Sequence, residues 1–110
     1  MEWLNRKTAR ALIGVGRGRV DETSWEDFLA SISAAIEEAS DLGLPLVIDL
    51  GGIDYMSSRG LRVLTLAKRA AEASKVGLTL ARPNPRMAEI LAISRYDRIF
   101  TVASDLEADA

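Results

Sequence analysis

The side chains able to do chemistry are few in this chain. The sequence contains no histidine and no cysteine, which excludes thiolate catalysis, disulfides, the common zinc sites and the usual general base. What remains is a pair of neighbouring hydroxyls, Ser57 and Ser58, and two carboxylates, Asp49 and Asp54. A serine hydroxyl can carry a phosphate or cap a helix. Its role therefore depends on the elements that position it.

A strand before the two serines and a helix after them are predicted. Residues 46–50 form the predicted strand, which opens with a continuous apolar run containing the β-branched pair Val47 and Ile48; such a run is typical of a strand with both faces covered. The glycine pair at 51–52 is expected to end this strand, and residues 53–56 to form a connecting loop. The apolar period then becomes helical from about Ser58 to Ser74. A hydroxyl at a helix start accepts from unpaired N–H groups, and the helix dipole there favours a phosphate.

The two carboxylates give little support for an enzymatic function. Asp49 and Asp54 flank the glycine pair near the carboxyl end of the strand, where open α/β sheets place ligands. The glycine-rich residues 14–18 lack the lysine and the following helix of a phosphate loop. We therefore predict a protein that is not an enzyme and has no metal or cofactor, with Asp49 as a turn-forming or capping residue.

The chain before the central strand predicts a hairpin and a helix. Residues 10–15 read as a strand, residues 16–18 as a turn and residues 19–21 as a short returning strand. Thr23 or Ser24 is expected to cap a helix whose apolar side chains recur at helical spacing. Gly43 and Pro45 should stop that helix.

The chain after the second helix predicts another strand, helix and strand. Leu78–Ala81 is expected to be a strand, followed by a helix with Asn84 as its cap and Pro85 at its first position. The inward side of this helix should carry Met87, Ile90, Leu91 and Ile93. Residues 99–102 read as a last strand, and residues 103–110 as an acidic, unordered tail.

This alternation predicts the fold class and the domain organisation. We expect an α/β fold in one domain spanning residues 1–110, with its core at about 10–102. It should hold a four- to five-stranded, mostly parallel mixed sheet with an opening antiparallel hairpin, packed by helices.

The composition of the chain limits the cellular locations and the kinds of partner expected for this domain. A net charge of −2 disfavours a nucleic-acid partner. The apolar stretches fall short of the roughly 20 residues of a membrane span, and no signal peptide is visible. A cytoplasmic protein is expected. The first predicted helix is acidic and the second is basic, which fits either two solvated faces or a docking surface.

In their order and spacing, these segments resemble the STAS domain family, best known from bacterial anti-sigma factor antagonists. Gly18-Arg-Val-Asp21 is similar to the end of the family's opening strands, residues 46–50 to its central strand, and residues 53–56 to the loop that follows. Gly60-Leu-Arg-Val-Leu64 is similar to the start of the family's second helix. The resemblance covers residues from about 10 to 102.

The resemblance implies partner switching. In such antagonists the unphosphorylated domain binds a serine kinase that doubles as an anti-sigma factor, and phosphorylation within Asp-Ser-Ser/Thr-Gly releases it. Here this segment reads Ser57-Ser58-Arg59-Gly60. Ser57 stands at the aspartate position, Ser58 matches the first hydroxyl residue, and Arg59 replaces the second. Ser58 is the expected phosphoacceptor, with Ser57 as second choice.

Two functions remain open at this point. One is an antagonist-like regulator that binds a kinase and is switched at Ser58. The other is an adaptor of the same family that is never phosphorylated and docks on a transporter ATPase or a signalling complex. In both, the partner surface is expected around the start of the second helix, at Asp21, Glu22, Thr23, Tyr55, Met56, Ser57, Ser58, Arg59, Gly60 and Arg62.

Overall fold

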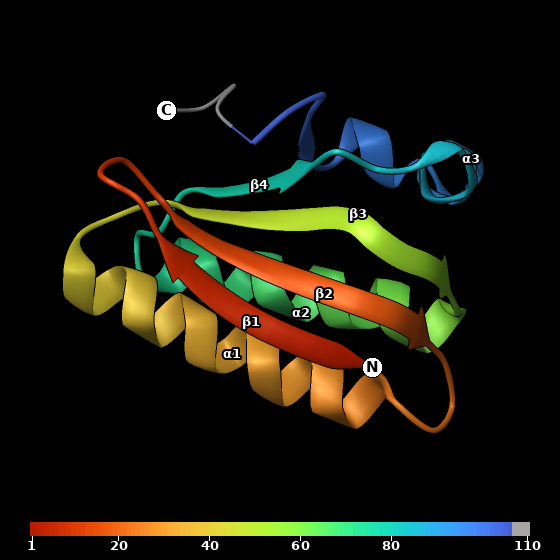
Figure 1. Cartoon of the computed structure of the whole chain (residues 1–110), viewed down its shortest axis with the longest axis horizontal. Helices are drawn as coiled ribbons and strands as arrows, with labels where there is room; N and C mark the ends of the chain where they lie inside the picture. The colour runs from red at the N-terminus through yellow and green to blue at the C-terminus, as the bar shows by residue number, and fades with distance from the viewer. Residues whose placement is uncertain (107–110) are drawn as a thin grey trace.

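The computed structural model describes residues 1–106, and the strands among them form one five-stranded sheet in the order β1-β2-β3-β4-β5 (Figure 1). β1 (Glu2–Lys7) pairs antiparallel with β2 (Leu12–Val20). β3 (Leu46–Met56), β4 (Leu78–Ala81) and β5 (Thr101–Ala103) continue the sheet in parallel. The predicted mixed, mostly parallel sheet is confirmed.

The helices α1 (Trp25–Leu42) and α2 (Ser58–Ala73) lie side by side along one face of the sheet (Figure 1). Their apolar sides and the facing strand residues form the main core, which includes Phe28, Ile32, Ile48, Leu64 and Leu80. The short helix α3 (Pro85–Ser94) packs near the end of β3 and contributes to the same core. A 3₁₀ turn, η1 (Tyr96–Arg98), leads into β5.

The first half of the central strand is buried on both faces, as its apolar opening predicts. All residues of the stretch 46–50 are buried. Ile48 faces the helices, while Val47 packs with Ile13 and Ala81 on the other face of the sheet. Alternate side chains of a strand point to opposite faces, so burial of consecutive residues requires cover on both.

The glycine pair does not end this strand, and the prediction of a loop at residues 53–56 is wrong. β3 continues to Met56 because β2 continues beside it. From Val15 to Arg17 β2 advances two positions, while its partner positions on β3 advance three, from Asp49 to Gly52. The glycines therefore lie in a β-bulge, which bends a strand without ending it.

The opening hairpin exists, but the predicted strands are misplaced. β1 begins at Glu2, and the sheet therefore starts before the residue-10 boundary expected for the core. β2 runs straight through residues 16–18, which are predicted to form the turn. The Trp3 indole lies against Gly14 so closely that a Cβ there would overlap it. Glycines stay in this strand because they admit that ring.

The start of α3 follows the prediction. Asn84 is its N-cap and accepts a hydrogen bond from the Met87 N–H at 2.9 Å, with Pro85 at the first helical position. Met87 and Leu91 are buried as expected, and Ile90 packs against the core. Ile93 does not face inward, because its side chain is 75% exposed.

The last strand begins two residues later than predicted, at Thr101, because the N–H groups of residues 99 and 100 donate to the Tyr96 carbonyl in η1. Phe100 is buried and Ile99 is half exposed. The predicted tail, residues 103–110, begins inside β5, because Ala103 is the last residue of that strand. Leu106 packs against the apolar cluster on the other face of the sheet, which contains Ile13, Val47 and Ala81. Residues 107–110 of that tail lie outside the described part of the chain.

Candidate functional site

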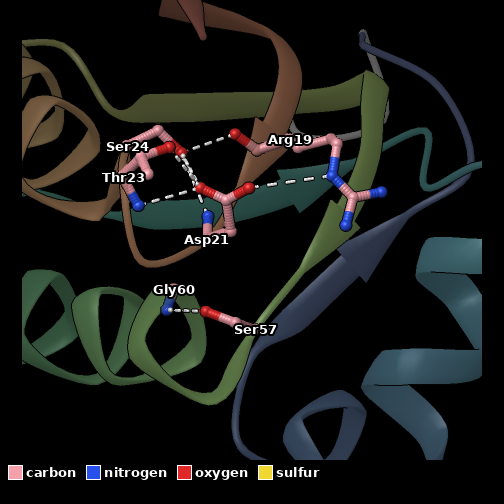
Figure 2. Close-up of polar contacts among 6 residues, drawn as sticks. All are labelled: Arg19, Asp21, Thr23, Ser24, Ser57 and Gly60. Atoms are coloured by element: carbon pink, nitrogen blue, oxygen red, sulfur yellow. Dashed lines mark hydrogen bonds and ion pairs between the residues drawn. The ribbon is translucent and has the colours of Figure 1, made fainter.

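The two serines lie where three segments meet: the end of β3, the first turn of α2 and the turn that follows β2. The Ser57 N–H donates to the Val20 carbonyl at 2.8 Å and ties the start of α2 to the end of β2. Figure 2 shows the serine segment facing the turn at residues 19–24. The segments predicted to form one surface are therefore neighbours.

The two hydroxyls do different things. Ser57 is the N-cap of α2, and its Oγ accepts from the Gly60 N–H at 3.5 Å (Figure 2). Ser58 is the first residue of α2 and is exposed to solvent. One serine serves the helix, and the other offers an exposed hydroxyl at the positive end of the helix dipole.

The turn after β2 is a closed network around Asp21 (Figure 2). The Asp21 carboxylate accepts from the Thr23 hydroxyl at 2.8 Å and from the Thr23 N–H at 3.0 Å. These hydrogen bonds, the hydroxyl first, hold the pKa of Asp21 below its ordinary value. The carboxylate stays ionised at neutral pH.

Ser24 completes this turn and does not cap α1 through its side chain. It occupies the N-cap position, as one of the two residues predicted there, but makes no side-chain cap hydrogen bond. Its buried hydroxyl donates to the Arg19 carbonyl at 2.7 Å and accepts from the Asp21 N–H at 3.0 Å. The side chain stabilises the turn, so the predicted capping role is wrong.

Arg59 links α2 to the β2–α1 turn. Its Nε lies 2.7 Å from the Glu22 carboxylate, and its guanidinium lies 5.4 Å from the Trp25 ring centroid. Arg62 is exposed one turn further along α2, and its side chain makes no hydrogen bond or ion pair with any residue from 1 to 106. Arg59 is thus engaged within the domain, while the charge of Arg62 remains available to a partner or a phosphate.

Tyr55 is held between two arginines that the sequence did not indicate. The Arg19 guanidinium lies 4.6 Å from its ring centroid and the Arg86 guanidinium 5.7 Å from it. These are cation–π contacts, which orient the ring. Arg19 comes from β2 and Arg86 from α3. No sequence spacing relates residues on such distant elements, and their basic character was the only signal.

Met56 and Gly60 lie beneath this surface and not on it. Met56 is 2% exposed and belongs to the core. It was expected to offer an exposed apolar contact, which is wrong because β3 extends to this residue and turns its side chain inward. A Cβ on Gly60 would overlap Met56 Cγ and lie 2.7 Å from Val20 Cγ1. Gly60 therefore lets α2 begin close to the sheet.

The two carboxylates considered as catalytic groups, Asp49 and Asp54, lie in different environments. Asp49 is 3% exposed and accepts from the Gly51 N–H at 2.9 Å. This bond lies within β3, so the prediction of a turn-forming or capping role is wrong. Asp49 also accepts two hydrogen bonds from Arg82, at 3.1 Å and 2.9 Å. These bonds raise the pKa of the Arg82 guanidinium above its ordinary value. Asp54 is exposed, so the buried Asp49 serves the structure and does not join it in a shared site.

The described residues, 1–106, contain neither a metal-binding cluster nor a membrane-spanning helix. No group of three or more acidic, histidine or cysteine side chains suited to a metal ion occurs among them. None of the helices in this part of the chain has the length and apolar character needed to cross a membrane.

Comparisons with known proteins agree with this architecture. A family model described as Mlab, STAS domain matches residues 16–103. BtrV of Bordetella bronchiseptica, which is named as an anti-sigma factor antagonist, is 33% identical over 99 residues, covering 90% of this chain and 83% of BtrV.

Solved structures share the fold at lower identity. An anti-sigma factor antagonist from Mycobacterium paratuberculosis superposes with a TM-score of 0.83 at 18% identity, covering 96% of this chain and 87% of that one. The anti-sigma factor antagonist SpoIIAA in its unphosphorylated form gives 0.73 at 21% identity, covering 97% and 92%. Its phosphorylated form, from Bacillus, gives 0.66 at 21% identity, covering 97% and 96%. On the family match and the similarity to BtrV, this chain belongs to the STAS domain family.

Proposed function

We propose that this protein is a non-enzymatic, cytoplasmic regulator of the anti-sigma factor antagonist type. In this proposal it binds a serine kinase that acts as an anti-sigma factor, and phosphorylation of Ser58 releases the complex. The observation that carries the proposal is the exposed Ser58 hydroxyl at the first residue of α2, beside a neighbour that already caps the helix. Membership of the family and the name of BtrV support the same class of function.

The binding surface in this proposal is the exposed rim around Ser58. It comprises the residues of the predicted set other than the two buried ones: Asp21, Glu22, Thr23, Tyr55, Ser57, Ser58, Arg59 and Arg62. Tyrosine and arginine are typical of the centres of protein interfaces. The turn at residues 21–24 is pre-formed by its own hydrogen bonds, so little ordering should accompany binding.

Phosphorylation would act locally on this surface. A phosphate on Ser58 adds roughly −1.5 to −2 charges at neutral pH. It would lie at a helix N-terminus, where Arg62 follows one turn later at i+4. The domain can therefore accommodate the phosphate without refolding. Release of the partner follows from charge and steric conflict within the interface.

A second candidate is a STAS adaptor that docks on a transporter ATPase or signalling complex without being phosphorylated. The observation that favours it is Arg59, which replaces the second hydroxyl of the family motif and is bound to Glu22. The same surface serves both candidates. They differ in whether Ser58 ever carries phosphate.

The surface is tested by reversing one charge. Affinity capture on the immobilised protein should identify the native partner, and purified partner is then titrated against variants. We expect Arg62→Glu to weaken binding by at least about tenfold, because a charge at the centre of the interface is inverted. The unfolding free energy should change by less than about 0.5 kcal/mol, since the side chain is exposed.

The matched control is Arg69→Glu, an exposed arginine two turns further along the same helix. It makes the same change of charge away from Ser58 and should leave binding near the wild-type value. Equal losses in both variants would mean that only net charge matters. Full binding by Arg62→Glu would place the interface elsewhere.

A further inference from the structure

The sheet has one long open edge. Its edge strands are β1 and β5. β5 spans only three residues, whereas β1 spans six and pairs with β2 in an unbroken register. Natural edges are commonly protected by short strands, prolines, bulges or charged side chains. β5 is short, whereas β1 is long and has no proline and no bulge. Its charged residues, Glu2, Arg6 and Lys7, carry both signs, so its outer side can pair with a strand of complementary charge.

The hydrogen-bond pattern identifies which backbone groups face this edge. The Thr8 N–H donates to the Ala11 carbonyl at 2.9 Å at the closed end of the hairpin. Hydrogen-bonded pairs alternate along an antiparallel ladder. The backbone groups of Leu4 and Arg6 therefore point toward β2, and those of Trp3 and Asn5 point outward from the sheet.

The sequence of β1 is complementary to itself in the antiparallel direction. When two copies pair about Leu4, Glu2 lies opposite the second copy's Arg6, and Arg6 opposite the second copy's Glu2. Leu4 then faces its own counterpart, and Trp3 exchanges backbone hydrogen bonds with the second copy's Asn5. Leu4 is 65% exposed in the single chain. In this register the leucine and charge pairs are non-hydrogen-bonded pairs, in which side chains approach most closely.

We propose that this protein forms a two-fold symmetric dimer by pairing β1 with β1 of a second copy in this register. Both charge pairs and the leucine pair lie on the face of the sheet opposite the helices, because Trp3 on the other face packs against Phe28. Neither Glu2 nor Arg6 makes an ion pair with another residue among 1–106. A second copy supplies both partners at once. The contact is isologous and closes at two chains.

This inference goes beyond the proposed function and does not depend on it. β2 separates β1 from β3, at whose end α2 begins, so pairing through β1 leaves Ser58 exposed. Because the two strands run in opposite directions, the Ser58 surfaces of the two copies would lie toward opposite ends of the joined sheet. The dimer would present two separate partner surfaces.

The test is sedimentation equilibrium of the untagged chain from micromolar to millimolar concentration, with charge variants of β1. We expect a concentration-dependent dimer. Glu2→Arg alone or Arg6→Glu alone places like charges opposite each other twice, and each should weaken association by at least roughly fivefold. The double variant restores opposite charges and should return the constant toward the wild-type value. Glu89→Arg, an exposed site on α3, is the charge-matched control and should have no effect.

Amide exchange supplies the readout that fixes the register. On dimerisation the N–H groups of Trp3 and Asn5 should become protected, while those of Leu4 and Arg6, already directed at β2, should change little. Far-ultraviolet circular dichroism confirms that each variant is folded. A wild-type chain that stays monomeric at millimolar concentration overturns the proposal. So does a folded double variant that fails to recover, or a dimer without new protection at Trp3 and Asn5.

Discussion

At the scale of single residues, the proposed function depends on the different roles of two adjacent serines. Ser57 Oγ bonds the Gly60 N–H, and so the helix start does not need the Ser58 hydroxyl. Ser58 is exposed on the first turn of α2. The Arg62 guanidinium on the next turn makes no hydrogen bond or ion pair with residues 1–106, while Arg59 forms an ion pair with Glu22. This arrangement separates the stability of the helix from the availability of Ser58, the proposed phosphoacceptor.

These different roles predict that replacing each serine by alanine lowers the free energy of unfolding by a different amount. Ser57→Ala removes the cap and should lower the free energy of unfolding by about 0.5–1 kcal/mol, toward the low end for caps because the bond is long. Ser58→Ala should change it by less than about 0.5 kcal/mol. Urea unfolding of both variants measures the difference. A larger loss from Ser58→Ala than from Ser57→Ala would contradict the assignment of the cap.

The sequence predicted many of these residues but not their orientations. The pattern at residues 57–60 located the helix start and the exposed Ser58. It could not show that Met56 turns inward, because that follows from the pairing of β3 with β2. Nor could it show that Arg19 and Arg86 contact Tyr55, since those contacts join β2, β3 and α3 only in the folded chain.

At the scale of elements, the position of α2 depends on one glycine. Gly60 faces Met56 on β3 and Val20 on β2, and there is no room for a methyl group between them. Since the first turn of α2 carries Ser58, any displacement of the helix start moves the proposed binding surface as well.

Gly60→Ala should therefore destabilise the domain even though alanine favours helices. Overpacking costs typically ~1–3 kcal/mol, which outweighs the helix-propensity gain of about 1 kcal/mol over most of that range. Gly77→Ala is the control, because a Cβ there would meet only Pro45 at an ordinary 3.6 Å. Thermal unfolding of the two variants compares them. A Gly60→Ala protein as stable as the wild type would show that α2 is not held as closely as described.

The helices and strands could be predicted where local apolar periodicity and helix caps determine them. The bodies of α1 and α2, the cap and proline of α3 and the buried stretch 46–50 follow from such patterns. The glycines at 16–18 and 51–52 are predicted to interrupt strands, and this is wrong because each segment is held in a strand by a neighbour distant in sequence. β1 pairs with β2, and β2 pairs with β3 past the bulge at Gly52.

At the scale of the whole molecule, the sheet separates two surfaces. α1 and α2 cover one face, Ser58 lies where β3 passes into α2, and β1 forms an edge on the far side of β2 (Figure 1). Partner binding and self-association can then occur at different places. The fold class could be predicted from the alternation of strands and helices, whereas the open edge could not, because β1 was not recognised as a strand.

The central claim is that Ser58 is the switched residue of an antagonist-type regulator. Its most direct test is mass-spectrometric mapping of phosphate after incubation with the serine kinase captured from native cells and ATP. We expect phosphate on Ser58, with labelling lost in Ser58→Ala, retained in Ser57→Ala, and accompanied by release of the partner. Phosphate on Ser57 would contradict the assignment. Phosphate on neither serine, with the partner still bound, would contradict the switch and support the adaptor.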